Sequence, residues 1–349
     1  MKKTGILRIG ALLLALIVTL SAVSCADNEN GGQNAQTKRN DHTYYGYFDT
    51  VASIYDYSGK SDAEFRYVCE TLMELTEKYH ELFDIYHEYD GVTNIAYLNS
   101  MAGKGAVSVG EDLIEFLEYS KDMYEKTDGY VNVAMGAILS MWHDSRSAGI
   151  ANPEAASLPD EQKLLEAAEH CNIDDLVIDR EKMTVELRDP KMSLDVGAIA
   201  KGYTVERLAK WLLEREYFGF VIDIGGNLRV IGTKPDGSGW KTGVKNPFTI
   251  VDYVHVFELN NESAVTSGGY ERYYVVDGKR YHHIIDKDTM MPSVHFASVS
   301  IVCEDSGLAD ALSTALFCMD IDSGMRIASA LGVNNVIWVM NDGTVKTLK

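Results

Sequence analysis

The sequence predicts an α+β fold in which a mostly antiparallel sheet packs against grouped helices. Two long segments, residues 62–83 and 111–127, carry apolar residues at the three-and-four spacing of an amphipathic helix. Beyond residue 216 the pattern changes to short strands separated by glycine-containing turns, and Asp277-Gly278 is the clearest hairpin signal among them. Helices that are grouped apart from runs of strands are typical of α+β proteins.

The other elements follow from the same spacing rules. In chain order, strands are predicted at residues 44–57, 177–179, 184–187, 272–276 and 279–285, with a last pair turned at 341–343. Helices are predicted at residues 62–83, 111–127, 134–142, 160–170, 201–216, 306–317 and 323–331.

The first residues have the features of a targeting segment. Lys2, Lys3 and Arg8 precede an apolar run, so residues 1–24 are expected to be a signal peptide. The run ends in Ala-Val-Ser-Cys, which resembles a bacterial lipobox and predicts a lipid on Cys25; a plain signal peptide or an uncleaved anchor is the alternative. Residues 25–41 are polar and without apolar period, as in a flexible tether. The folded domain is then expected at residues 42–349, outside the cytoplasm and anchored to the cell membrane.

Composition restricts the possible ligands. A formal net charge of −20 argues against nucleic acid as a partner, because phosphate-backbone binding needs a basic face. A site for a smaller phosphate compound would therefore have to carry its own cations. The four cysteines after residue 25 show no zinc-type spacing, and whether any of them pair is left open. They are Cys69, Cys171, Cys303 and Cys318.

The segment LDVGAIAKGY at residues 194–203 predicts a strand that leads through small residues into a helix. Small side chains allow a ligand to approach the backbone, and a helix N-terminus offers free amide groups and positive partial charge to a phosphate. Lys201 would add a full positive charge. The alternative is an ordinary strand-to-helix turn in which the glycines only relieve crowding.

Asp310 and Thr314 lie four residues apart on the helix predicted at 306–317. Side chains at this spacing share one helix face, so a carboxylate and a hydroxyl can converge on one ion. Such oxygen ligands suit Mg²⁺, which usually takes further oxygens from water or phosphate. The alternative is a solvated Asp beside a Thr that bonds back to its own helix.

Two adjacent histidines, His282 and His283, end the second strand of the predicted hairpin. Because side chains alternate across a strand, only one of them can face a site. A neutral imidazole can accept a proton from a hydroxyl near pH 7, which makes His283 a candidate general base and leaves His282 as a packed or surface residue. Tyr86, Tyr89 and Tyr130 could stack on an aromatic ligand or simply pack.

Taken in order, these segments resemble the ApbE family of FAD:protein FMN transferases over residues 47–331. The resemblance rests on LDVGAIAKGY at 194–203, GGN at 225–227, GTKPDG at 232–237, TSG at 266–268 with Tyr270, Arg272 and Tyr273, HIID at 283–286, and ADALSTAL at 309–316. Several ordered motifs over most of a chain are far more specific than any one of them. The chain departs from the family pattern at Phe48-Asp49, where Met-Gly is usual, and at Val131-Asn132, where Phe-Asp is usual.

The resemblance implies a T-fold-related α+β architecture and assigns roles by position. The implied metal ligands are Ala198, through its carbonyl, Asp310 and Thr314. The implied FAD contacts are Phe48, Tyr86, Tyr130, Val131, Asn132, Asp195, Lys201 and Ile285. His283 is the candidate base, and Asp310 could share that role.

The activity that the resemblance implies is Mg²⁺-dependent transfer of FMN from FAD to a threonine or serine hydroxyl of an acceptor protein. The transfer forms a phosphoester bond and releases AMP, and the acceptor would be an extracytoplasmic redox subunit. Two alternatives remain open at this stage: hydrolysis of FAD to FMN and AMP, and flavin binding by a lipoprotein without catalysis.

Overall fold

The computed structural model describes residues 39–249 and 252–348, and its central element is an eight-stranded sheet in which every strand pair is antiparallel. In spatial order the strands are β1 (Asn40–Tyr47), β2 (Thr50–Asp56), β6 (Phe220–Ile224), β7 (Asn227–Ile231), β10 (Ser263–Gly268), β13 (Ser298–Cys303), β14 (Asn335–Val339) and β15 (Val345–Leu348). The predicted α+β class with a mostly antiparallel sheet is confirmed.

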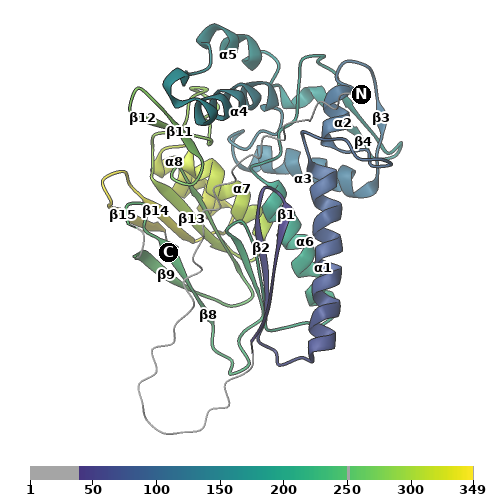
Figure 1. Ribbon diagram of the computed structural model, residues 1–349, viewed down its shortest axis with the longest axis vertical. Helices are drawn as coiled ribbons and strands as arrows, with labels where there is room; N and C mark the ends of the chain where they lie inside the picture. The colour runs from purple at the N-terminus through teal and green to yellow at the C-terminus, as the bar shows by residue number, and fades with distance from the viewer. Residues whose placement is uncertain (1–38, 250–251, 349) are drawn as a thin grey trace, which may run out of the picture. The chain divides into compact units, whose positions relative to one another are not determined.

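The helices fall mainly between β2 and β6 and after β13 (Figure 1). They are α1 (Asp62–Phe83), α2 (Ile95–Ser100), α3 (Glu111–Lys126), α4 (Gly136–Ala151), α5 (Glu161–Ala168), α6 (Ala200–Glu214), α7 (Ser306–Phe317) and α8 (Ile321–Ala330). Two short 3₁₀ turns lie at Pro153–Ala155 and Ile173–Asp175. The predicted helices are confirmed to within a few residues except α4, which continues nine residues beyond its predicted end at Trp142.

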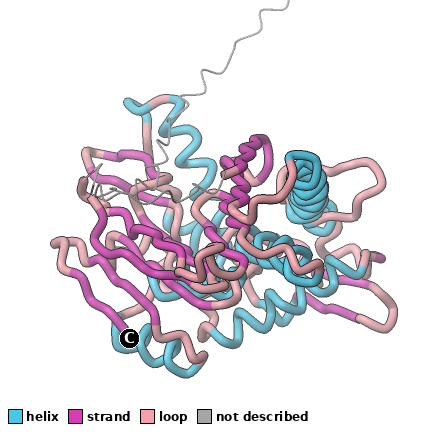
Figure 2. The backbone as a smooth tube through the Cα atoms, turned by 90° about the horizontal axis from the view of Figure 1, so that it is seen from below, coloured by secondary structure: helices cyan, strands magenta, loops and turns pink. Residues whose placement is uncertain are grey.

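The two faces of the large sheet are covered differently. Phe220, Ile222 and Ile224 of β6 are buried in one core with α1 and α6, while Val221 between them joins a second core on the other face. That second face is covered by the hairpin of β8 (Trp240–Lys245) and β9 (Tyr253–Leu259). Successive side chains of a strand point to opposite faces, so a strand covered on both faces places its apolar residues alternately in the two cores. Figure 2 shows the strands of the sheet side by side with helices packed beside them.

The prediction of one strand over residues 44–57 was wrong, because the segment is a hairpin. Strands β1 and β2 pair from Tyr47 with Thr50, so Phe48 and Asp49 form a two-residue turn. Both residues have positive φ, 52° and 50°, as the central residues of a type I′ turn do. The turn was missed because no Gly or Asn marks it. His80 of α1 holds it by accepting a hydrogen bond from the Phe48 amide at 3.3 Å through Nδ1.

Two smaller sheets complete the fold. Strands β3 (Val107–Ser108), β5 (Thr184–Leu187) and β4 (Leu176–Asp179) form one of them, and β11 (Tyr273–Val276) pairs with β12 (Lys279–His282) in the other. The Asp277-Gly278 hairpin is confirmed, although β12 ends three residues before the predicted 285. The β11–β12 hairpin lies beside α4 at one end of the described domain (Figure 1).

Helices α6 and α7 cross at Gly202. A Cβ at this position would lie 2.4 Å from the Cβ of Asp310 and 2.5 Å from the carbonyl oxygen of Ser306. Real Cβ atoms do not approach so closely, so only glycine permits the crossing. The crossing brings the N-terminal turn of α6 against the middle of α7.

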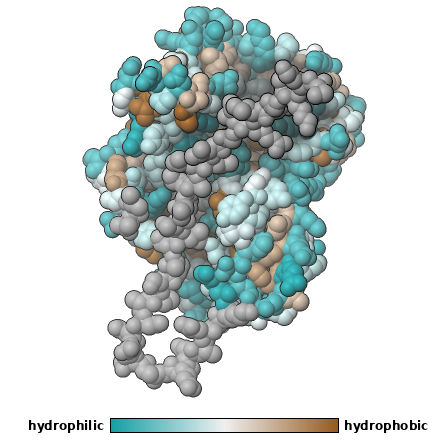
Figure 3. Space-filling model, viewed as in Figure 1, coloured by the Kyte–Doolittle hydropathy of each residue, from teal (hydrophilic) through white to brown (hydrophobic). Residues whose placement is uncertain are grey.

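The described part of the chain contains no helix that is both long enough and apolar enough to cross a membrane. The face of the domain seen in Figure 3 is mostly hydrophilic, with only scattered apolar residues. The four cysteines of this part are free thiols.

Gly202→Ala should lower the free energy of unfolding by about 1–3 kcal/mol, because the added methyl group would push α6 away from α7. Gly324→Ala is the matched control. Its Cβ would meet Leu316 and Trp338 at an ordinary 3.4 Å, and alanine is the better helix former. Urea denaturation of the two variants measures the difference. Equal stability would contradict a tight crossing at Gly202.

Candidate functional site

The carboxylate of Asp310 is held at the N-terminal end of α6. Its Oδ2 accepts a hydrogen bond from the Gly202 amide at 2.8 Å. The Nζ of Lys201 lies 3.9 Å from the same oxygen and donates to the Gly197 carbonyl at 3.4 Å. The positive end of α6 and one ammonium group therefore face a single carboxylate.

Asp310 is buried, and desolvation raises the pKa of its carboxyl. The charge of Lys201 and the Gly202 amide oppose this shift. No other described residue hydrogen-bonds to the carboxylate, so its Oδ1 has no protein donor within the described ranges. A buried carboxylate with little compensation favours a further cation beside it.

Hydroxyl groups surround the same position on α7. The Oγ of Ser267, at the end of β10, lies 3.3 Å from the Thr314 Oγ1 and 2.8 Å from the Ser313 Oγ. Ser313 in turn donates to the Asp310 carbonyl at 2.9 Å. The predicted pair of Asp310 and Thr314 is thus accompanied by a hydroxyl from the sheet, Ser267 of the TSG motif, which was not among the predicted ligands.

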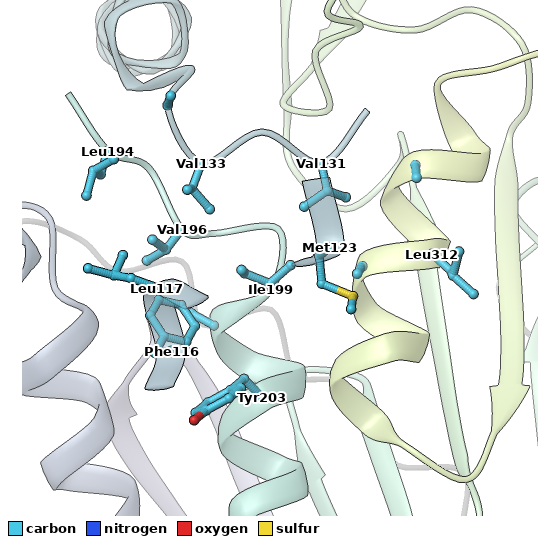
Figure 4. Close-up of a cluster of buried hydrophobic side chains, with 14 of the residues drawn as sticks. Phe116, Leu117, Met123, Val131, Val133, Leu194, Val196, Ile199, Tyr203 and Leu312 are labelled. Carbon is cyan, nitrogen blue, oxygen red and sulfur yellow. The ribbon is translucent and has the colours of Figure 1, made fainter. Parts of the chain in front are cut away.

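Residues 194–199 form the turn that leads into α6. Asp195 accepts a hydrogen bond from the Gly197 amide at 2.9 Å, which fixes the turn. Figure 4 shows Leu194, Val196 and Ile199 in one buried apolar cluster, which fixes the turn to the core. Ala198 lies between Gly197, whose carbonyl contacts Lys201, and Ile199, the N-cap residue of α6. Its carbonyl is therefore placed on the same turn as the Lys201 contact.

The chemistry of these oxygens fits Mg²⁺ better than a softer metal. In the described residues no three His, Cys, Asp or Glu side chains gather where they could hold an ion. A metal here would depend on one carboxylate, neutral oxygens and ligand phosphate, which is the set that magnesium commonly uses. The predicted ligands Ala198, Asp310 and Thr314 offer oxygens of these kinds.

A second group of polar side chains lies on α4. The Nδ1 of His143 is 3.2 Å from the Tyr86 hydroxyl and 3.2 Å from an Arg146 guanidinium nitrogen. Tyr86 is 56% exposed, so one edge of this group is open to solvent. Desolvation and the nearby charge of Asp195 raise the Tyr86 pKa. Desolvation raises the pKa of the Asp195 carboxyl, and the charges of His143, Arg146 and Lys201 oppose this rise. Asp195 is thus close enough to both groups to feel their charges.

His283 is close enough to Arg146 of this group for the charge of the arginine to lower its pKa. Its Nδ1 lies 3.2 Å from the Arg272 carbonyl, which can only accept, so Nδ1 carries the proton and Nε2 the lone pair. Burial lowers the His283 pKa to about 3, and the charges of Arg272 and Arg146 contribute. The ring is therefore neutral near pH 7, with no described residue bonded to Nε2.

His282 plays a different part, as the alternation along the strand predicts. Its Nε2 donates to the Ser293 carbonyl at 2.8 Å, and its Nδ1 accepts from the Ile284 amide at 3.2 Å. Both ring nitrogens are used by the backbone. His282 lines a cavity of about 560 Å³ that His283 does not line.

The predicted flavin contacts differ in how far their side chains are buried. Phe48 sits in the strained turn between β1 and β2, with its ring 5.5 Å from that of His80. The side chain of Val131 is fully buried in the core with Met123 (Figure 4), and that of Ile285 is nearly so, in the cluster with Trp142. Side-chain contact with a ligand is therefore closed to Val131.

Tyr130 and Asn132 are tied to neighbouring loops. The Tyr130 hydroxyl donates to Asp288 at 2.9 Å, and the Nζ of Lys287 lies 4.4 Å from the ring centroid. Asn132 donates to the Cys171 carbonyl at 3.0 Å and accepts from the Ala134 amide at 2.9 Å. Asn132 thus fixes the loop between α3 and α4, and Tyr130 connects this loop to the turn that contains Asp288.

Sequence reasoning missed His143 and Arg146. The helix had been predicted to end at Trp142, so these residues fell outside it. The signal that could have found them is their spacing. His143 and Arg146 are three residues apart, so on a longer helix they share one face, and the structure shows them in contact.

A buried carboxylate beside a cation, and a neutral imidazole facing two arginines, are features of a catalytic centre. The chain belongs to the ApbE family, whose model matches residues 48–337, and it is an enzyme.

Relatives named FAD:protein FMN transferase include one from Klebsiella pneumoniae (strain 342), 30% identical over 255 residues, which cover 72% of this chain and 76% of the relative. Another, from Treponema pallidum (strain Nichols), is 29% identical over 312 residues, covering 85% and 83%.

Solved structures agree with this assignment. The crystal structure of the ApbE protein from Thermotoga maritima has a TM-score of 0.78 at 28% identity and covers 89% of this chain and 97% of its own. The flavin transferase ApbE from Vibrio cholerae has a TM-score of 0.73 at 22% identity, covering 88% and 96%. The second likeness bears on the fold alone.

His283 predicts a pH dependence of stability. The unfolded chain takes up a proton on this ring as the pH falls through about 6.5, whereas the folded chain does so only near its lowered pKa of about 3. Stability should therefore fall from pH 7.5 to pH 5. Over this pH range, the melting temperature of His283→Gln should fall less than that of the wild-type protein. An equal loss would mean that the folded ring titrates normally.

Proposed function

We propose that this protein is an FAD:protein FMN transferase that moves FMN from FAD to a threonine or serine hydroxyl of an acceptor protein and releases AMP. The observation that carries the proposal is the Asp310 carboxylate, buried against the N-terminal turn of α6 with Lys201 beside it. A dinucleotide diphosphate needs cations and free amide groups, and this turn offers both. The names of the relatives support the same reaction.

Magnesium is the cofactor we propose for this site. Asp310, Thr314 and the carbonyl of Ala198 would hold the ion, and when bound it would neutralise negative charge on the diphosphate. Lys201 adds a fixed positive charge that is independent of the metal.

His283 is the base that we propose for the acceptor hydroxyl. Its lone pair lies on Nε2, since Nδ1 donates to the Arg272 carbonyl. The hydroxyl oxygen attacks the FMN-side phosphorus, a new P–O bond forms, the bond to the AMP oxygen breaks, and the hydroxyl proton passes to Nε2. Phosphoryl transfer of this type depends mainly on positioning and charge stabilisation.

Whether AMP release depends on an acceptor protein distinguishes FMN transfer from FAD hydrolysis. If the chain is a transferase, AMP release from FAD should require an acceptor protein, and flavin fluorescence should appear on the acceptor band of a denaturing gel. AMP release at the same rate without acceptor would identify an FAD pyrophosphatase instead. FAD binding without any AMP, with or without Mg²⁺, would identify a storage protein.

Asp310→Asn should reduce transfer by about 10²–10³-fold, because the amide keeps the Gly202 hydrogen bond but removes the charge. Its melting temperature should not fall, since neutralisation removes an unfavourable buried charge. Asp342→Asn, on the surface turn before β15, is the matched control and should keep wild-type activity. Full activity of Asp310→Asn at low magnesium would refute the role of this carboxylate.

We also propose that residues 1–24 are a signal peptide, that Cys25 carries a lipid, and that the segment from Cys25 to the start of β1 tethers the domain to the outer side of the cell membrane. The predicted boundary at residue 41 was two residues too late, because Asn40 and Asp41 already pair with β2. The signal and Cys25 lie outside the described residues, so the proposal rests on the sequence. An acceptor on the same side, such as a redox subunit, fits this location.

Cys25→Ser should abolish incorporation of a labelled fatty acid and move the protein from the membrane fraction to the medium or periplasm. Labelling followed by fractionation tests this. Retention of the label in Cys25→Ser would contradict lipidation at this residue.

A further inference from the structure

An open groove of about 560 Å³, here called the hairpin groove, lies along the β11–β12 hairpin. Its walls come from Phe248 after β8, from strand β12, from most of residues 289–297 and from Asn341 after β14. Its volume is that of a ligand-binding cleft, about 300–1,000 Å³. His282 lines the groove, and the next residue in the chain is His283, the base proposed above.

His282 joins the wall of the hairpin groove to the segment that carries this base. Its Nε2 donates to the carbonyl of Ser293, another lining residue, at 2.8 Å, and its Nδ1 accepts from the Ile284 amide at 3.2 Å. The ring of His283 is held separately, through Nδ1 on the Arg272 carbonyl. Because the wall and the base are hydrogen-bonded parts of one short segment, a ligand in the groove would have a fixed position relative to His283.

The solvent-facing charges of the hairpin groove are positive. Lys279 and Arg280 are exposed at its rim, whereas Asp286, the one carboxylate among its described lining residues, is 6% exposed. The Oδ1 of Asp286 accepts hydrogen bonds from two amides of its own turn. Glu271, which precedes the hairpin, is paired with Lys245 at 3.3 Å. The groove therefore differs in sign from a chain whose net charge is −20, and it favours an acidic ligand.

Aromatic rings hold both cations at the rim. The guanidinium carbon of Arg280 lies 4.6 Å from the centroid of the Tyr273 ring, and the Nζ of Lys279 lies 5.0 Å from that of Tyr281. A ring attracts a cation without cancelling its charge. The two charges are thus positioned on the hairpin before any ligand binds, which lowers the entropy lost on binding.

Large apolar side chains lie beside the two cations. Phe248 and Val294, on different walls of the hairpin groove, are 54% and 73% exposed. The amide of Asn341 donates to the Val294 carbonyl at 2.8 Å, so this part of the wall is fixed. Tyr270 and Phe296 line the groove as well. Aromatic residues and arginine are enriched at protein–protein interfaces, so these walls fit a protein segment better than a small anion.

We propose that the hairpin groove binds the acceptor protein, through an extended segment that carries acidic and apolar side chains on both sides of the modified hydroxyl. The proposal deepens the proposed function and rests on it. Charge complementarity selects an acidic partner and suppresses basic ones. Since His282 lines the groove and His283 does not, the groove holds residues that flank the hydroxyl, while the hydroxyl itself reaches the Nε2 of His283.

The test uses two peptides as probes. They are about ten residues long, roughly 33 Å when extended, with a central threonine between phenylalanines, and they differ only in flanking aspartates or lysines. Fluorescence anisotropy measures their binding to the full chain. The aspartate peptide should bind about tenfold more tightly than the lysine peptide, and added salt should weaken its binding.

The double variant Lys279→Glu with Arg280→Glu should bind the aspartate peptide about tenfold more weakly, because two attractive charges become repulsive. Lys104→Glu is the matched control and should change nothing, since this exposed lysine lies outside the groove and donates to the Ser100 carbonyl. Both variants should bind FAD as tightly as wild type, measured by flavin fluorescence.

Equal binding of the two peptides to the wild-type chain would overturn the proposal, and so would unchanged peptide binding in a double variant that keeps its melting temperature. Loss of FAD binding in the double variant would place the groove in the cofactor site instead. If the double variant lost only its binding to vesicles of phosphatidylcholine and phosphatidylglycerol, the cations would belong to a membrane-contact surface. Selective binding of the aspartate peptide by a chain that transfers FMN to no protein would support the groove and overturn the proposed function.

Discussion

The contact between Asp310 and the backbone of Gly202 is the interaction on which the rest of the site depends. It places a carboxylate from the middle of α7 at the N-terminal turn of α6, at a distance of 2.8 Å. The missing side chain of Gly202 makes this approach possible, since any Cβ would collide with Asp310 and Ser306. Within the described ranges, the charge is compensated by one amide and by a lysine at 3.9 Å. This incomplete compensation makes the site receptive to a cation and its anionic ligand.

An acidic protein can bind a diphosphate if its positive charge is local. Here the cations lie in two groups, with Lys201 at the turn into α6 and Arg146 and Arg272 near α4 and the β11–β12 hairpin. Asp195 feels the charges of both groups. Because exposed charges are screened over about 8 Å at physiological salt, the remaining acidic surface has little effect at this position. Net charge therefore excludes nucleic acid more firmly than it excludes a nucleotide.

The sequence predicted those parts of the fold that local patterns specify. Helix α1 and the Asp277-Gly278 hairpin follow from periodicity and turn chemistry, and both are present. The turn at Phe48-Asp49 could not be predicted, because its positive φ angles are imposed by packing against His80 rather than by the residues themselves.

The candidate site shows the same division. Asp310, Lys201 and His283 lie in motifs, and the structure gives each a polar neighbour: the Gly202 amide for Asp310, the Asp310 carboxylate for Lys201 and the Arg272 carbonyl for His283. Their catalytic and binding roles stay predictions. The side chain of Val131, a predicted FAD contact, is buried in the core, so contact through its backbone atoms stays a prediction. Ser267 reaches Thr314 only through the folded sheet, 47 residues away in sequence. Contacts of this kind require the tertiary structure.

Anomalous scattering from a crystal of the full chain grown with FAD and Mn²⁺ in place of Mg²⁺ would test the central claim most directly. The account predicts one manganese peak within about 2.5 Å of an Asp310 carboxylate oxygen, adjacent to Thr314 and to the FAD diphosphate. Bound FAD with no metal at Asp310, or with the metal on another set of ligands, would contradict it.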